Sequence, residues 1–574
     1  MRSMVRRSLA LLTLVALLLG VVGASAPAAF ARQSTSTRVA GINVDATTIP
    51  QLQRLMDRHR LTSVQLVQFY LNRIKKLNPM LHAIVAVSPT ALADARAADK
   101  ARRRGDHRPL LGIPVIVKDN IDTIGMPTTA GSYALKGSSP SDAFVVQRLR
   151  AAGALIIAKA NLSEWANFRS IPSSSGWSGI GGQTNMPYVL DRNPCGSSSG
   201  SGVAAAADLA TVAVGTETDG SVVCPAGANA LVGIKPTVGL VSRAGIVPIT
   251  ADQDTAGPMT RNVTDAAVVL GAMTGVDSAD PATSAQVGHA FGDYTQFLDK
   301  DALAGTRIGV WRKDTYNLRT DQDIEPILAE AIDALKSRGA TVIDPTDIDL
   351  SAAFANEYLA LTCEFKSDIA SYLGTYTSAS YPKTLQDLIA FNDAHPALEG
   401  PWNSQIFLDA QATGGRGAPD CQAARAAATS GTQAALDGVM AANNLDAIIA
   451  VTNGPAWVTN PDPEKGDLDG DFGLFVGSST ASAVAGYGTI TVPAGYVGPL
   501  PIGVSFIGGR WDEANLIGLA YAFEQATKVR VPPTFLESTS AVTAAAAARQ
   551  PATTAERRAV APDRHGHWRM PPLR

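Results

Sequence analysis

Cysteine and histidine are both scarce in this chain of 574 residues, which contains four cysteines and seven histidines. Four cysteines are too few for a scaffold held together by disulfides, and their spacing matches no zinc motif. Cys195 and Cys224 flank a serine-rich region, and we expect them to be small buried apolar side chains rather than a redox pair. Cys363 and Cys421 are a candidate disulfide pair, although sequence alone does not define the connectivity.

The chain also lacks a marked excess of charge, because its formal net charge is −3. Without a basic region, nucleic acid is not an expected partner. Hydrophobic residues make up 46% of the chain and charged residues 17%, which is ordinary for a globular enzyme and unlike a disordered protein. The composition therefore favours a folded enzyme or binding protein.

Long apolar runs are rare, and the most pronounced one lies at the N-terminus. Three arginines precede the apolar segment 9–22, and an Ala-x-Ala site follows it. This pattern predicts a secretory signal peptide over residues 1–31, which a polar segment over 32–43 follows. The adjacent arginines at positions 6 and 7 leave twin-arginine export open as a route. The run is too short for a convincing membrane span and no cysteine follows it, so we expect a secreted protein without a stable membrane anchor.

Residues 194–221 contain two glycine- and serine-rich loops, and the remaining chain reads as scaffold around them. Small residues at 201–208 predict a helix, and β-branched residues at 211–214 predict a strand that leads into the second loop. Glycines let a backbone approach a ligand closely and leave amide groups free to bind an anion. The composition of the first loop is also typical of a flexible linker, but the apolar helix and strand that follow argue against one. Two serines on two such loops indicate nucleophilic chemistry.

The scarcity of histidine determines which base could serve these serines. No histidine lies between His107 and His289, whereas a serine hydrolase by default uses a histidine base. Lys118 ends the apolar run 110–118, which predicts a strand buried on both faces. A lysine there is most often a surface residue with a buried stem. Ligand crevices form at the ends of such strands, however, and a desolvated lysine can lose its proton and act as a base. Asp119 faces the opposite side of the strand and need not neutralise it.

Three other local patterns compete with this interpretation and fit less well. Residues 196–200 match the G-x-S-x-G elbow of α/β-hydrolases, but a loop rather than a strand precedes them. Residues 380–383 have the S-x-x-K spacing of penicillin-binding enzymes, but Pro382 is unfavourable in the helix that this motif needs. Residues 467–471 resemble part of a calcium loop, but the closing glutamate is missing, and we expect a solvated acidic loop there.

Strand-like and helix-like segments alternate through the rest of the chain, which predicts α/β layers. Capping boxes at Thr48 and Thr62 predict the starts of two early helices. Residues 536–574 are rich in alanine, proline and arginine, and we expect a disordered tail there. The further expected elements are strands at 306–310, 340–343, 447–451, 490–497 and 502–507, and helices at 91–104, 325–337, 422–441 and 512–526.

Six sequence blocks connect the lysine, the serine loops and the end of the folded region. In chain order they are LGIPVIVKDN (111–120), PCGSSSGSG (194–202), GTETDGSVVCPA (215–226), GIKPTVGLVSR (233–243), GPMTRNVTD (257–265) and VPAGY (492–496). As an ordered set, they strongly resemble the amidase-signature family. The resemblance implies a single large α/β domain over residues 44–535, whose mixed central sheet is covered by helices on both faces.

The resemblance also implies the chemistry of the site. It makes Ser221 the nucleophile, Ser197 a bridging serine on a cis peptide, and Lys118 the base of a Ser-cisSer-Lys triad. The proton of Ser221 would pass through Ser197 to Lys118 and return to the leaving amine. This mechanism requires no metal and no organic cofactor. Backbone N–H groups of the oxyanion hole would come from Thr218, Asp219, Gly220 and Ser221.

Two positions depart from the commoner family pattern. Asp219 replaces a usual glycine beside the nucleophile, and Ser199 replaces a glycine after the serine pair. A negative charge at Asp219 would oppose the developing oxyanion unless the side chain points away or meets a cation.

The variant sequence TDGS, together with NLSEWANFR (161–169) and GWSGIGGQTN (176–185), is similar to the bacterial peptide amidase branch, whose members remove ammonia from C-terminal peptide amides. Trp165, Phe168 and Trp177 in these blocks could equally pack in the core or line the substrate cleft.

The expected function is that of a secreted amidase, which hydrolyses a small-molecule or peptide amide and releases ammonia through an acyl-enzyme. An amidase of the same fold acting on fatty-acid or aryl amides is one alternative. A secreted binding protein that has lost catalysis is another, which the presence of all three triad residues disfavours. A tRNA-dependent amidotransferase subunit has the same scaffold, but export would separate it from its cytoplasmic partners. Oligomeric state is not defined by the sequence.

Overall fold

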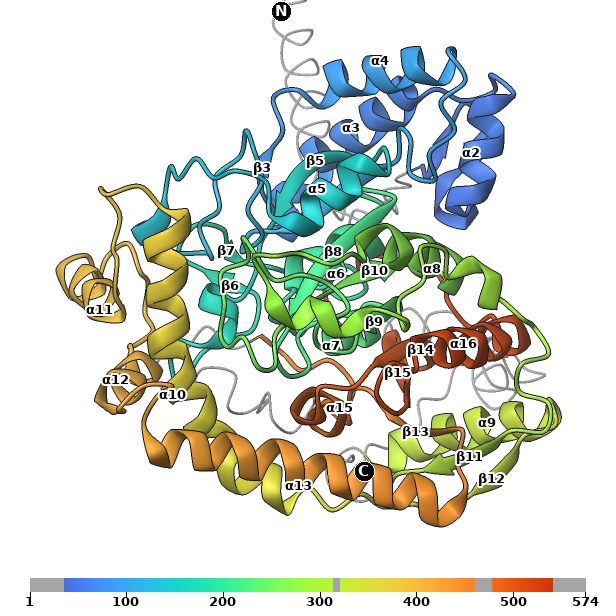
Figure 1. The fold of residues 1–574 in the computed structure, drawn as a ribbon. Coiled ribbons are helices and arrows are strands. Elements are labelled where there is room, and N and C mark those ends of the chain that lie inside the picture. The colour runs from blue at the N-terminus through green and yellow to red at the C-terminus, as the bar shows by residue number, and fades with distance from the viewer. Residues whose placement is uncertain (1–35, 313–320, 460–476, 540–574) are drawn as a thin grey trace, which may run out of the picture. The chain divides into compact units, whose positions relative to one another are not determined.

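A computed structural model describes residues 36–312, 321–459 and 477–539 (Figure 1). The expected signal peptide, the acidic segment 467–471 and residues 540–574 of the expected tail lie outside the described residues. The chain divides into two units after Arg38, and every element discussed below belongs to the unit that begins at Val39. Among the described residues, no helix is both long enough and apolar enough to cross a bilayer.

An eleven-stranded mixed sheet forms the centre of this unit (Figure 1). In order across the sheet the strands are β12 (Thr341–Ile343), β11 (Arg307–Val310), β13 (Ala447–Val451), β15 (Leu500–Ile507), β14 (Thr489–Val497), β9 (Val232–Lys235), β10 (Thr255–Thr260), β8 (Val212–Glu217), β4 (Pro114–Lys118), β5 (Leu155–Ala160) and β3 (Ile84–Val87). Strand β4 lies between two parallel neighbours, β5 and β8, while β8, β10, β9, β14, β15 and β13 pair antiparallel in that order. The expected α/β class with a mixed sheet is therefore confirmed.

Within the three described segments of the chain, the structure contains fourteen α-helices. In chain order they are α2 (Ile49–Asp57), α3 (Ser63–Leu81), α4 (Ala91–Arg102), α5 (Phe144–Ala151), α6 (Ser199–Ala206), α7 (Val223–Ala228), α8 (Val263–Met273), α9 (Asp321–Ser337), α10 (Ser351–Tyr376), α11 (Leu385–Ala394), α12 (Gln405–Ala412), α13 (Pro419–Asn443), α15 (Ser479–Ala485) and α16 (Glu513–Thr527). The expected capping boxes at Thr48 and Thr62 begin α2 and α3.

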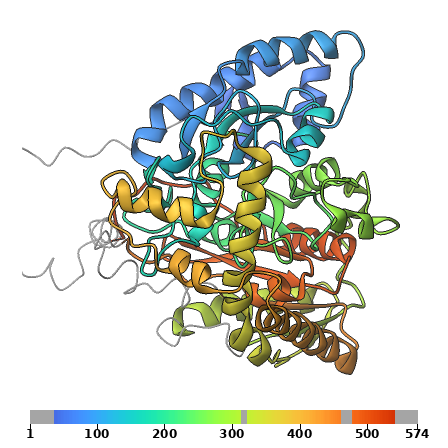
Figure 2. The same cartoon turned by 60° about the vertical axis from the view of Figure 1, so that its left-hand side comes forward.

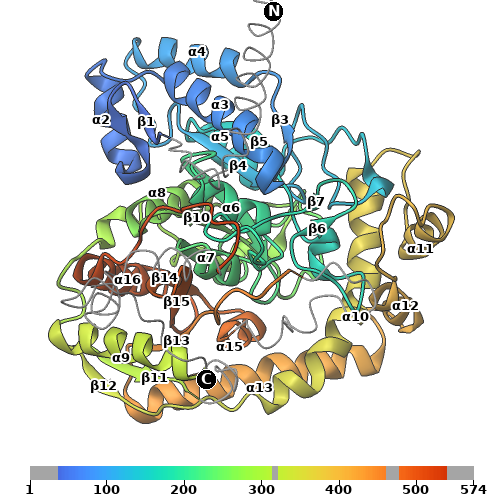
Figure 3. The same cartoon turned by 180° about the vertical axis from the view of Figure 1, so that it is seen from behind.

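Helices cover both faces of the sheet, as successive residues of β13 show. Ile449 and Val451 belong to an apolar cluster with α9 and α16, whereas Ile448 and Ala450 belong to a second cluster with α13 and α15. Side chains alternate between the two faces of a strand, so the two clusters mark opposite sides of the sheet. Figures 1 and 3 show these helices from opposite sides.

The strand that carries Lys118 is shorter than the expected run 110–118, because β4 begins only at Pro114. Gly112 has φ = +75°, and a Cβ there would lie 2.0 Å from Ser63 Oγ. This backbone conformation suits glycine, and it places a turn before the strand. All five residues of β4 are buried, as expected of a strand covered on both faces.

A layer of helices formed by α10, α11 and α12 packs beside the loops that follow β4 and β5 (Figure 2). Phe365 of α10 and Phe407 of α12 share an apolar cluster with Trp165 and Phe168, which follow β5. This layer supplies one wall of the site described below.

All four cysteines form disulfides. Cys363 of α10 is bonded to Cys421 of α13, which confirms the candidate pair. The expectation that Cys195 and Cys224 are unpaired apolar side chains was wrong, because these two residues form the second disulfide. Both are fully buried as expected, but the fold brings their Cα atoms to 6.0 Å, and sequence spacing does not report that proximity.

Candidate active site

Lys118 lies at the C-terminal end of β4 and is fully buried. Its Nζ atom lies 2.8 Å from Ser197 Oγ, 2.9 Å from Thr216 Oγ1 and 3.2 Å from the Thr216 carbonyl oxygen. Burial lowers the pKa of Lys118 to about 7, although the nearby carboxylates of Asp254 and Glu217 act in the opposite direction. A large fraction of this amine is therefore uncharged at neutral pH, as a proton acceptor must be.

Ser197 lies in the loop that precedes α6, and the peptide bond between Gly196 and Ser197 is cis. Its carbonyl oxygen accepts a hydrogen bond from the backbone N–H of Ser163 at 3.0 Å. Gly196 approaches the same segment so closely that a Cβ there would lie 2.4 Å from Ser163 Oγ. The loop after β5 therefore holds the Ser197 loop against the end of β4.

Ser221 lies in the loop between β8 and α7. Its carbonyl oxygen accepts a hydrogen bond from the N–H of Ser198 at 3.1 Å, so the two serine loops are in direct contact. Because β4 and β8 are parallel neighbours, Lys118 and the loop of Ser221 emerge at the same edge of the sheet. The structure thus brings Lys118, Ser197 and Ser221 into one region from segments far apart in the chain.

The Ser221 loop is held by a carboxylate that the sequence did not single out. Glu217 Oε2 accepts hydrogen bonds from the N–H groups of Val222 at 2.7 Å and Val223 at 2.9 Å. Burial raises the pKa of Glu217, while Lys235 and these hydrogen bonds lower it. Glu217 and Thr216 both lie within the block GTETDGS, but nothing local to that block distinguishes their roles.

The other residues expected to form the oxyanion hole, Thr218, Asp219 and Gly220, directly precede Ser221 in the chain. Among the residues that the structure describes, none accepts a hydrogen bond from the backbone N–H groups of Asp219, Gly220 and Ser221. These groups are therefore available to a ligand. The N–H of Thr218 likewise has no acceptor among the described residues. Its hydroxyl donates to Asp254 Oδ1 at 2.5 Å and its carbonyl oxygen accepts from Gln253 Nε2 at 3.0 Å, which fixes the position of the residue.

The side chain of Asp219 is engaged by two hydroxyl groups rather than directed at the N–H groups beside Ser221. Ser479 and Thr480, at the start of α15, each donate a hydrogen bond to its carboxylate. Burial raises the pKa of Asp219, whereas the two hydroxyls and the more distant Lys235 lower it. The departure from glycine at this position is thus accommodated by a local polar pocket.

A cavity of about 330 Å³ opens beside Ser221. Helix α10 contributes Phe354, Glu357 and Leu361 to its wall. The remaining lining residues are Ala166, Asn167, Phe168, Thr218, Asp219, Ile249, Ser479 and Thr480. The cavity therefore combines an apolar wall with a polar floor at the serine, which is the usual character of a small-molecule site.

The aromatic residues of the 161–185 region have three different environments. Phe168 lines the cavity. Trp165 packs edge-on against Phe407 in the core, at 5.8 Å between ring centroids. Trp177 lies edge-on to Trp402, at 6.2 Å, in a separate small pocket. Of these three aromatic residues, only Phe168 lines the cavity beside Ser221.

Of the three competing motifs, the two that fall within the described residues do not form sites. Residues 380–383 lie outside any helix, as Pro382 led us to expect, and Lys383 donates hydrogen bonds to the carbonyl oxygens of Leu373 and Thr377. A loop rather than a strand precedes residues 196–200, which excludes the α/β-hydrolase elbow.

Comparisons with known proteins agree with this geometry. Residues 65–517 match the Amidase family. A probable amidase of Arabidopsis thaliana is 40% identical over 508 residues, which cover 86% of this chain and 92% of the relative. The native peptide amidase from Stenotrophomonas maltophilia is 46% identical and has a TM-score of 0.79, with 85% of this chain and 99% of that chain covered. The peptide amidase PAM in complex with the competitive inhibitor chymostatin has the same identity and coverage and a TM-score of 0.80. The chain is therefore an amidase and belongs to the amidase-signature family.

Proposed function

We propose that this amidase hydrolyses C-terminal carboxamides of peptides through an acyl-enzyme formed on Ser221, with release of ammonia. The buried contact of 2.8 Å between Lys118 Nζ and Ser197 Oγ, next to the loop of Ser221, carries the proposal. An amine with a pKa of about 7 can accept a proton from a serine hydroxyl at neutral pH.

In the proposed reaction, Ser197 gives its proton to Lys118 and takes the proton of Ser221, whose oxygen attacks the carboxamide carbon. The free N–H groups of 219–221 stabilise the negative charge that develops on the carbonyl oxygen. The proton then returns through Ser197 to the leaving nitrogen, the C–N bond breaks, and ammonia departs. Water attacks the acyl-enzyme through the same relay, which releases the carboxylic acid and restores Ser221.

Two observations support a peptide amide as the substrate. The chain is 46% identical to a peptide amidase, and a protein of that name binds chymostatin as a competitive inhibitor. In addition, burial and the nearby Asp219 raise the pKa of Glu357 to about 8, so this cavity residue is mostly uncharged at neutral pH. A cavity with an apolar wall and few charges suits an uncharged carboxamide and its neighbouring side chain.

Ammonia release from peptide amides, long-chain fatty-acid amides and anilides, measured side by side, tests the substrate class. We expect kcat/KM to be highest for N-blocked peptide amides. A higher value for fatty-acid amides or anilides would favour the corresponding alternative. If no amide is turned over and a serine-directed inhibitor leaves no adduct on Ser221 in mass spectra, the chain is a binding protein instead.

We also propose that the protein is exported. The N-terminal sequence supports this proposal, and so do the two disulfides, because such bonds persist mainly in oxidising compartments. Expression of the full chain in a bacterium, followed by fractionation and N-terminal sequencing, tests it. We expect an extracytoplasmic protein that starts at Arg32, whereas a cytoplasmic protein with an intact N-terminus would contradict the proposal.

A further inference from the structure

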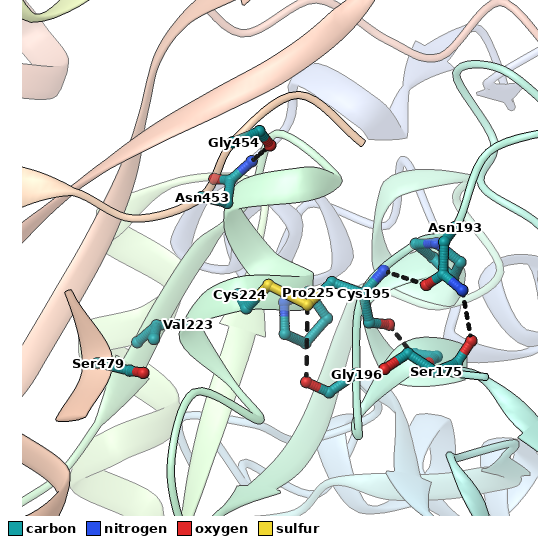
Figure 4. The surroundings of a disulfide bond; sticks show 12 residues. Ser175, Asn193, Cys195, Gly196, Val223, Cys224, Pro225, Asn453, Gly454 and Ser479 are labelled. Atoms are coloured by element: carbon teal, nitrogen blue, oxygen red, sulfur yellow. Dashed lines mark hydrogen bonds between the residues drawn. A yellow bond between two sulfur atoms is a disulfide. The ribbon is translucent and has the colours of Figure 1, made fainter. Parts of the chain in front are cut away.

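The Cys195–Cys224 disulfide joins the two loops that carry the serines of the proposed relay (Figure 4). Cys195 lies two residues before Ser197, and Cys224 lies three residues after Ser221. Figure 4 shows the bond between the loop of Gly196 and the helix that contains Cys224 and Pro225. The crosslink therefore acts directly on the relative position of Ser197 and Ser221.

Both ends of the bond are firmly placed. The N–H of Cys195 donates to Asn193 Oδ1 at 2.9 Å, and its carbonyl oxygen accepts from Ser199 Oγ at 2.6 Å. Cys224 lies in α7, where its N–H donates to the Gly220 carbonyl at 2.8 Å. Both cysteines are fully buried and share an apolar cluster with Trp457. Movement of either loop would thus be transmitted to the other through a rigid connection.

The other connections between the two segments are single hydrogen bonds. Ser198 N–H donates to the Ser221 carbonyl oxygen, and Asn229 Nδ2 donates to the Pro194 carbonyl oxygen at 3.0 Å. Ser198 Oγ also donates to the Thr216 carbonyl oxygen at 3.0 Å and accepts from the Thr216 N–H at 3.2 Å. A net hydrogen bond contributes only about 1 kcal/mol to stability. Proton transfer between hydroxyl groups, in contrast, needs the oxygens within roughly 3 Å of each other.

We propose that the Cys195–Cys224 disulfide is a positioning element for catalysis, which holds the Ser197 loop against the Ser221 loop and so limits the separation of the two hydroxyl groups. The inference rests on the proposed relay. Loss of the bond lowers turnover by separating the two serine loops, and it leaves substrate binding nearly intact, because most of the cavity wall comes from other segments such as α10.

The second disulfide supplies a matched control. Cys363 and Cys421 are 58 residues apart in sequence, compared with 29 for Cys195 and Cys224. A crosslink that closes a longer loop restricts the unfolded chain more, so general stability predicts the larger effect for the control pair. If the Cys195–Cys224 disulfide positions the two serines, however, its removal should lower kcat more than removal of the Cys363–Cys421 disulfide does.

The experiment compares the variants C195A/C224A and C363A/C421A with the wild type on whichever amide the wild type hydrolyses fastest. We expect kcat to fall by more than about tenfold in C195A/C224A with KM changed less than about threefold, while C363A/C421A keeps kcat within about twofold. The acidic limb of the kcat profile should also move to higher pH in C195A/C224A, because a looser site hydrates Lys118 and raises its pKa. If C195A/C224A has the same kcat as the wild type and the same pH dependence of kcat, the inference is wrong.

A second variant decides the case in which C195A/C224A does not fold. C195V/C224A removes the S–S bond and keeps an apolar side chain of similar volume in the buried cluster with Trp457. We expect the same loss of kcat and the same shift of its pH dependence as in C195A/C224A. A folded C195V/C224A variant with the kcat of the wild type would overturn the inference. A wild type that is inactive on every amide would instead refute the proposed function.

Discussion

Lys118 and Asp119 are neighbours in the chain, yet their side chains lie in two separate polar networks. Lys118 Nζ contacts Ser197 and Thr216, whereas the Asp119 carboxylate pairs with Lys159 Nζ at 3.2 Å. Asp119 also accepts a hydrogen bond from the Thr129 hydroxyl. Because the carboxylate nearest in sequence is engaged elsewhere, burial dominates the pKa of Lys118 and lowers it to about 7.

Activity should rise with pH as Lys118 loses its proton. Below a pKa of about 7 the amine is charged and cannot accept the proton of Ser197, so kcat/KM should fall by about tenfold per pH unit well below that value. Rates between pH 5 and pH 9 check this prediction, provided that chemistry limits turnover. A flat profile over this range would exclude Lys118 as the base.

Lys118→Met should abolish turnover and yet stabilise the protein. The pKa of Lys118 is lower in the folded state than the usual 10.5, so folding disfavours the charged amine. The resulting cost is fully present below pH 7 and shrinks as pH rises towards 10.5. We expect the gain in unfolding free energy to be about 3 kcal/mol larger at pH 6 than at pH 9, as measured by urea denaturation. An equal gain at both values would mean that Lys118 is charged in the fold.

Ser221→Ala should reduce turnover by at least about 10³-fold without unfolding the protein, since it removes the attacking oxygen. Circular dichroism and ammonia release measure the two effects. Ser201→Ala is the matched control, because Ser201 Oγ donates to the Val214 carbonyl within the same region and does not contact Lys118. The control should keep turnover within about fivefold and lose about 1 kcal/mol of stability. Residual activity within tenfold of wild type in Ser221→Ala would remove this residue from the nucleophile role.

We expect catalysis to depend on Glu217 more as a hydrogen-bond acceptor for the Ser221 loop than as a negative charge. Glu217→Ala removes the acceptor of the Val222 and Val223 N–H groups and should lower kcat by about tenfold or more, with a stability loss of about 1–3 kcal/mol. Glu217→Gln keeps a carbonyl oxygen in place and should retain most of kcat. Since the charge of Glu217 raises the pKa of Lys118, the acidic limb of Glu217→Gln should move to lower pH. A limb that moves to higher pH would contradict this electrostatic coupling.

Asp219→Asn tests the charge beside the nucleophile. Asparagine keeps one acceptor oxygen for Ser479 or Thr480 and removes a negative charge close to the developing oxyanion. We expect kcat to rise by up to about threefold and the melting temperature to fall, because one charge-assisted hydrogen bond is lost. Steady-state kinetics and thermal denaturation measure both changes. A tenfold loss of kcat in a folded variant would show that the charge assists catalysis.

Local sequence patterns were sufficient to place the principal elements of the site. The run that ends at Lys118 is a buried strand because its side chains are apolar on both faces, and small residues after the first serine loop form α6. Both properties depend on neighbours within a few residues. The β-branched residues at 211–214 likewise predicted a strand that leads into the loop of Ser221, and β8 is found there at Val212–Glu217.

The sequence by itself therefore determined the α/β class, the strand of Lys118 and the two serine loops. Only the tertiary structure decided that Glu217 holds the Ser221 loop, that α10 supplies the wall of the cavity, and that Cys195 is bonded to Cys224. The physical reason is distance along the chain. Periodicity and turn chemistry act over a few residues, whereas a cavity wall or a disulfide depends on segments that meet only after the whole sheet has assembled.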